Sequence, residues 1–203
     1  MRRLFFGLAA LAIAVACSNS SGPNLPPPVP NSQLHIVRQD TAAPPLLADS
    51  ASFYAVVGQD RELRMYYQGA TPSDTGQEFL RFKVPGDGLL RRPDGSVFQL
   101  GDSILITVKV VDPTKFLFDF QPTGLRFSPD HPAELTFEYL NSDHDFNDDG
   151  VVNASDSTIQ TQLDIWQRQP SDTFWTRTQA LNYESYDELD AKILHFTEHA
   201  IAW

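Results

Sequence analysis

The sequence predicts an all-β fold, an antiparallel sandwich, over roughly residues 49–203. The first observation is that apolar and polar residues alternate in the segments 80–84, 104–110 and 134–139. Alternation with a period of two is typical of strands that turn one face to a core and the other to water. The second is the run of turn sequences between these segments: Pro85-Gly86-Asp87-Gly88, Pro93-Asp94-Gly95, Asp112-Pro113 and Pro129-Asp130-His131-Pro132. Short strands separated by such turns favour an antiparallel sandwich.

Residues 185–194 carry two conflicting signals. Ser185 with Glu188 resembles a capping box that could begin a helix. Leu189, Ala191 and Ile193 stand at alternate positions, which is the pattern of a strand. We predict a strand here.

Residues 1–16 have the features of a secretory signal. Met1-Arg2-Arg3 is a short basic start, and Leu4–Ala16 is an apolar run that ends in small residues. As a helix this run would cover about 20 Å, which is less than the roughly 30 Å hydrocarbon core of a bilayer. The alternatives are an ordinary signal peptide and one that directs attachment of lipid to the cysteine that follows it.

Ala14, Val15, Ala16 and Cys17 resemble the lipobox of bacterial lipoproteins, although that family prefers leucine where this chain has Ala14. The resemblance implies removal of residues 1–16, a lipid on Cys17, and a membrane-anchored place in the cell envelope. Ser18 after the cysteine favours the outer membrane. Cys17 is the only cysteine of the chain, so no disulfide framework is expected within it.

Residues 17–48 are expected to form a disordered, proline-rich linker after the lipidated cysteine. Five prolines lie close together in this stretch, at positions 23, 26, 27, 28 and 30. Such a composition buries too little apolar surface to order itself and favours extended polyproline geometry. The formal net charge of the chain is −11, and it would become −13 once Arg2 and Arg3 are removed. This balance argues against nucleic acid as a partner and suits divalent cations.

Two blocks of the sequence resemble the ZU5 domain, a β-sandwich with immunoglobulin-like architecture. The first comprises Phe120–Phe127 and Pro132–Tyr139, and the second is His195–Ile201, with Leu163–Trp166 and Trp175 between them. The resemblance covers roughly residues 78–203 and implies a role as an interaction or spacer module. The departures are Thr197 where the family usually has serine, His199 where it has an aromatic residue, and an acidic insert after Tyr139.

The insert, residues 143–156, contains a candidate calcium loop that begins at Asp145. Its expected ligands are Asp145, Asn147, Asp149, the carbonyl of Val151, Asn153 and Asp156. Gly150 stands where a calcium loop needs a sharp turn, and Val152 is expected to pin the loop to the core. The series resembles the loops of dockerins and EF-hands, with Asp156 in last place as dockerins have. The alternative is an acidic, solvated turn without metal.

No arrangement of residues clearly predicts an enzyme. The most specific catalytic possibility is self-cleavage between Phe196 and Thr197, which some ZU5-type proteins perform at a similar triplet, with His195 as the base and the Thr197 hydroxyl as the nucleophile. Ordinary strand packing is the preferred interpretation. A second possibility is glycan binding through an aromatic platform of Trp166, Trp175 and Trp203. We therefore expect a non-enzymatic protein with a membrane anchor and a protein or envelope-glycan partner.

Overall fold

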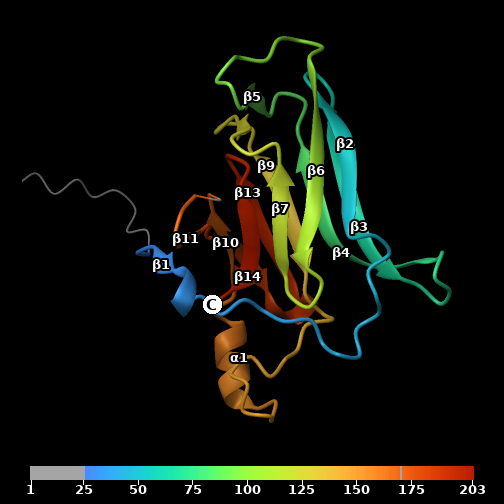
Figure 1. The fold of residues 1–203 in the computed structure, drawn as a ribbon, viewed down its shortest axis with the longest axis vertical. Coiled ribbons are helices and arrows are strands. Elements are labelled where there is room, and N and C mark those ends of the chain that lie inside the picture. The colour runs from blue at the N-terminus through green and yellow to red at the C-terminus, as the bar shows by residue number, and fades with distance from the viewer. Residues whose placement is uncertain (1–25, 170) are drawn as a thin grey trace, which may run out of the picture.

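The computed structural model describes residues 26–169 and 171–203, so the secretory signal and Cys17 lie outside the described residues. Most of the described chain forms two antiparallel sheets that face each other (Figure 1). The larger sheet has the order β1-β11-β10-β14-β7-β6-β2, with bounds Val29–Pro30 (β1), Phe174–Arg177 (β11), Asp164–Arg168 (β10), Glu198–Ala202 (β14), Leu117–Gln121 (β7), Ser103–Asp112 (β6) and Ser50–Val56 (β2).

The smaller sheet has the order β12-β13-β9-β4-β3, with bounds Leu181–Tyr183 (β12), Glu188–Ile193 (β13), Ala133–Glu138 (β9), Thr75–Val84 (β4) and Arg61–Gln68 (β3). A separate two-stranded ribbon joins β5 (Leu89–Arg91) to β8 (Arg126–Phe127) at one end of the molecule (Figure 1). The predicted all-β, sandwich-like fold is confirmed.

The core between the sheets is largely aromatic. Phe118 of the larger sheet stacks on Phe137 of the smaller one, with 4.6 Å between ring centroids. Phe82 of β4 meets Phe120 of β7 edge-on at 5.4 Å. In β6 the inward-facing Ile106, Val108 and Val110 are buried, as the alternating pattern predicts. Closely packed rings from facing strands thus join the two sheets into one core.

The ambiguous segment is a strand, as predicted. Strand β13 pairs with β9 over its whole length, from Glu188 opposite Glu138 to Ile193 opposite Ala133. A single 3₁₀ turn, Glu184–Tyr186, precedes it and ends at Asp187, whose φ is +51°. Burial of Leu189, Ala191 and Ile193 favours the strand, because a helix would not place alternate residues on one face.

The linker prediction is wrong at its C-terminal end. Strand β1 pairs with β11, and a 3₁₀ turn, Asn31–Gln33, follows it. Val37 is buried in the core, its N–H donates to the carbonyl of Ile201, and its own carbonyl accepts from the N–H of Phe116. The domain therefore begins near Val29 and not at residue 49. The prolines dominate the composition of the stretch and conceal the short apolar sequence that packs onto the sandwich.

One α-helix occurs within the described residues, and no helix is predicted there from the sequence. Helix α1, Ala154–Gln160, lies at the opposite end of the molecule from β5 (Figure 1). Asn153 caps its N-terminus and forms a capping box with Asp156. Within residues 26–169 and 171–203, no helix is long and apolar enough to cross a membrane.

Candidate functional site

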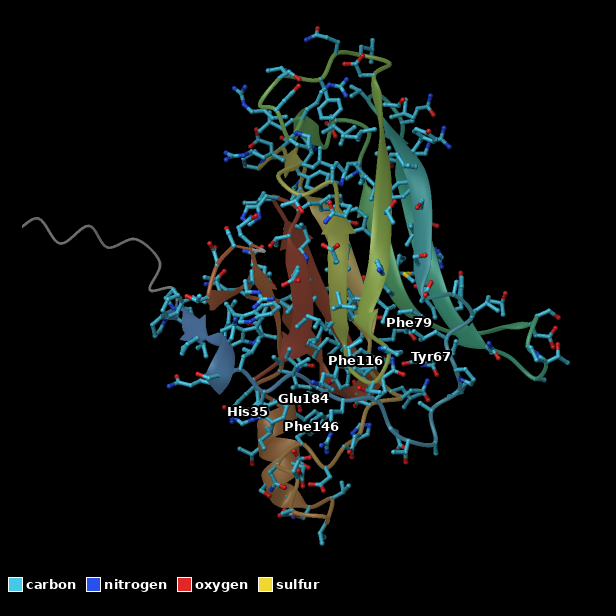
Figure 2. The ribbon with its side chains drawn as sticks, in the orientation of Figure 1. His35, Tyr67, Phe79, Phe116, Phe146 and Glu184 are labelled. Carbon is cyan, nitrogen blue, oxygen red and sulfur yellow. The ribbon has the colours of Figure 1, made fainter. Side chains whose placement is uncertain are left out.

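The acidic insert connects β9 to α1 at the base of the sandwich, where Figure 2 shows His35 and Phe146 close to α1. Phe146, the second residue of the loop, is buried and meets Trp203 edge-on at a centroid distance of 6.0 Å. Val152, which is expected from the sequence to pin the loop to the core, is exposed. That expectation is wrong. The loop is attached to the core instead through Phe146, near its other end.

Asp145 organises the first half of the loop. Its carboxylate accepts the backbone N–H of Asp149 at 3.1 Å and of Gly150 at 2.7 Å. Gly150 has a φ of +84°, in the region that glycine adopts without strain, so the expected sharp turn is present. The loop thus folds back around the side chain of its first residue.

Asp156 closes the second half of the loop. It is buried in the first turn of α1, and its carboxylate accepts the N–H of Asn153 at 2.9 Å and of Asn147 at 3.2 Å. These backbone donors, that of Asn153 foremost, hold the pKa of the Asp156 carboxyl below its usual range. One carboxylate therefore links the start of the loop to the start of the helix.

The other expected ligands bond to one another. The Asn147 amide nitrogen donates to Asp149 at 3.1 Å, and the Asn153 amide nitrogen donates to the Val151 carbonyl at 2.8 Å. The Asn153 side-chain oxygen accepts the N–H of Ser155 and thereby caps α1. Every atom of this set that could coordinate a metal ion is an oxygen, and calcium prefers oxygen ligands.

Within residues 26–169 and 171–203, no three His, Cys, Asp or Glu side chains are grouped so that they could hold a metal ion. A cation in this loop would therefore have to draw Asp145, Asp149 and Asp156 closer together than they lie here. The residue types fit a calcium ion, and the hydrogen-bonded loop holds all three carboxylates against its own backbone N–H groups.

Arg38 is a neighbour of the loop that is not predicted from the sequence. Its guanidinium forms ion pairs with Asp143 at 3.1 Å and with Asp148. These are the two acids of the insert that fall outside the expected ligand pattern. Arg38 belongs to the stretch assigned to the linker, so no local signal associates it with residues more than a hundred positions later. Its charge offsets two carboxylates and leaves Asp145, Asp149 and Asp156 without a basic partner among the described residues.

The His195-Phe196-Thr197 triplet packs as part of the sandwich. The Thr197 side chain is buried and its hydroxyl donates to the backbone carbonyl of Arg168. Phe196 is a core residue. Among the described residues the Nδ1 atom of His195 is buried without a hydrogen-bond partner, and no hydrogen bond joins His195 to the Thr197 hydroxyl. The hydroxyl proton is thus directed to a carbonyl oxygen and not to the base that cleavage would need.

The three tryptophans form no exposed row. Trp166 and Trp175 are buried, each covered by an arginine: Arg177 at 4.8 Å and Arg168 at 4.7 Å from the ring centroids. Trp203 stacks on His35 with 5.2 Å between ring centroids. Sugars stack on aromatic faces that solvent can reach, so Trp166 and Trp175 do not supply such a platform.

The chain matches no family model, no curated protein and no solved structure. Its likeness to ZU5 domains, dockerins and bacterial lipoproteins therefore stays a prediction from the residues quoted for it.

Proposed function

We propose that this chain is a lipid-anchored protein of the cell envelope without catalytic activity. In this proposal, calcium bound by residues 145–156 stabilises a β-sandwich that serves as an interaction or spacer module. The observation that carries it is the position of the Asp145 carboxylate, which holds the N–H groups of Asp149 and Gly150 and so turns the loop back on itself. A turn of this kind brings oxygen-bearing side chains from both ends of a short segment toward each other.

The role of the ion is structural. Asp145, Asp149 and Asp156 carry three negative charges within twelve residues, and their mutual repulsion opposes closure of the loop. Calcium bound there would neutralise this charge and fix the entry to α1. Extracellular calcium modules bind at about 10⁻⁴ to 10⁻³ M, a range that calcium outside the cytosol reaches.

Thermal unfolding of the mature chain with and without millimolar calcium tests the proposal. At ten times its dissociation constant, a ligand that binds only the folded state stabilises it by about 1.4 kcal/mol. For a domain of this size we expect the melting temperature to rise by roughly 3–5 °C. Magnesium at the same concentration should have a smaller effect, because it demands a tighter octahedral shell.

The double variant Asp145→Ala/Asp149→Ala should lose the calcium-dependent rise. A matched control is Asp130→Ala/Glu184→Ala, which removes the same charge at two exposed positions outside the loop and should keep the rise. The calcium proposal fails if the unsubstituted chain shows no shift, or if both double variants lose it equally.

The burial of Trp166 and Trp175 supports a protein contact over a glycan contact. Pull-down from intact cells with and without a calcium chelator would test this. A partner that is captured only with calcium supports an interaction module, whereas capture of envelope glycan alone would favour the alternative.

A further inference from the structure

We propose that a pocket at the end of the sandwich opposite α1 binds a phosphate group carried by a small organic ligand. The pocket lies between β5, β8 and the turn that joins β13 to β14, and its volume is about 570 Å³. Figure 1 shows β5 and α1 at opposite ends of the molecule, so this site is independent of the calcium loop. A cavity of this size accommodates more than an isolated ion and is typical of small-molecule sites.

The pocket is built on a row of basic side chains. Arg91 of β5 lies directly opposite Arg126 of β8 in the strand pairing. Arg126 in turn forms a bridge with His195, so that two arginines and a histidine follow one another across adjacent backbone segments. Like charges placed directly opposite each other across two strands destabilise the pairing. An anion between the two guanidinium groups would convert this repulsion into attraction.

The wall of the pocket contains no acid among the described residues. It is lined by Arg91, Arg92, Pro93, Gly95, Gly124, Arg126, Gln169 and His195. Arg92 is paired with Asp102 at 2.8 Å and covers the ring of Phe98. Arg91 donates to the carbonyl of Gly95, and in the part of the chain that the structure describes neither Arg91 nor Arg126 has a carboxylate within 4 Å. Two guanidinium groups therefore retain free donors in one pocket of a chain whose net charge is −11.

The charge and shape of these donors favour phosphate. A guanidinium presents a planar fork of N–H groups that matches two oxygens of a phosphate or a carboxylate. A phosphate monoester carries nearly two negative charges near neutral pH, whereas a carboxylate carries one. Arg91 and Arg126, with Arg92 beside them, thus complement a phosphate better. His195 lines the same pocket, but its Nδ1 atom is buried, so the exposed Arg91 and Arg126 supply the donors to the ligand.

Calorimetric titration of the mature chain with inorganic phosphate and with glycerol phosphate tests the site, with acetate as the carboxylate arm. We expect saturable phosphate binding that the double variant Arg91→Gln/Arg126→Gln weakens by at least about tenfold, equivalent to 1.4 kcal/mol. The control Arg61→Gln/Lys109→Gln removes the same charge from two exposed positions outside the pocket and should bind as the unsubstituted chain does.

The melting temperature provides a second readout. Without phosphate, Arg126→Gln should raise it, because the substitution relieves repulsion from Arg91. With phosphate, the unsubstituted chain should be stabilised and the variant should not.

Vesicles that contain phosphatidic acid, compared with glycerol phosphate in solution, distinguish a membrane-borne phosphate from a soluble one, and binding to either supports the site. The proposal is overturned if millimolar phosphate does not bind, if acetate binds equally well, or if the control variant loses binding to the same extent.

Discussion

The ring of Phe146 lies edge-on to that of Trp203, with 6.0 Å between the ring centroids. This contact attaches the acidic loop to the end of the last strand, and Phe146 is only 4% exposed whereas Val152 is 65% exposed. Phe146→Ala should therefore lower the free energy of unfolding by about 3–5 kcal/mol. Val152→Ala should change it by no more than about 0.5 kcal/mol. Urea denaturation of both variants measures the difference, and equal losses would contradict the assignment of Phe146 as the anchor.

The strands that alternate most regularly could be predicted from the sequence, because their pattern is local. Residues 104–110 show this, because every second side chain of β6 faces the core, as the alternation of apolar and polar residues predicts. Strand β1 could not be predicted. It has only two residues, too few to show an alternating pattern, and its Val29 pairs with Trp175 from a distant part of the chain. Helix α1 is too short for a helical period to show.

The same distinction applies to the sites. The calcium loop is one contiguous segment, so its spacing can be read directly. Arg38 reaches that loop only through the folded chain, and the row Arg91, Arg126 and His195 comes from three separate segments. Asn153 and Asp156 also carried an overlooked signal, because a residue pair at this spacing is a capping box as well as two ligand positions.

Cys17→Ser should release the protein from membranes. The lipid on Cys17 is the only anchor that the sequence predicts, and two or more acyl chains bind a bilayer stably where one does not. Fractionation of cells that express each form, together with labelling by a radioactive fatty acid, measures the effect. Ser18→Ala is the control and should leave the protein in the membrane fraction. Membrane retention of the Cys17→Ser protein would contradict lipid anchoring.

The purified protein should keep its C-terminal residues, without cleavage between Phe196 and Thr197. The Thr197 hydroxyl donates to the Arg168 carbonyl inside the fold, which leaves it without a base to activate it. Mass spectrometry of the purified protein should find residues 197–203 attached. Thr197→Ala should give a chain of the same length that is less stable by about 1–3 kcal/mol, because this partly buried hydrogen bond to the Arg168 carbonyl is lost. A fragment that ends at Phe196 would instead establish self-cleavage.

His199 should make the fold sensitive to mild acid. Its ring is fully buried against Phe120, and burial lowers its pKa from 6.5 to about 3. In the unfolded chain the pKa returns to about 6.5, so between these values the unfolded state binds the additional proton. The free energy of unfolding is therefore not reduced by His199 above about pH 6.5. Below that it falls by up to about 1.4 kcal/mol per pH unit as the pH decreases toward 3.

Urea denaturation at pH 7 and at pH 5 measures this loss, which we expect to reach about 2 kcal/mol. His199→Phe keeps an aromatic ring against Phe120 and removes the titrating group, so the part of the loss that comes from His199 should disappear. Burial also lowers the pKa of His195, which acts in the same direction and remains in this variant. His131→Phe, at an exposed position, should retain the loss. Asp164 acts in the opposite direction. Burial raises the pKa of its carboxyl, so the folded protein binds this proton more readily than the unfolded chain, and acidification stabilises the fold through this group. Only the difference between variants therefore isolates His199, and equal pH dependence in the His199→Phe protein and the unsubstituted chain would contradict its role as the buried neutral group.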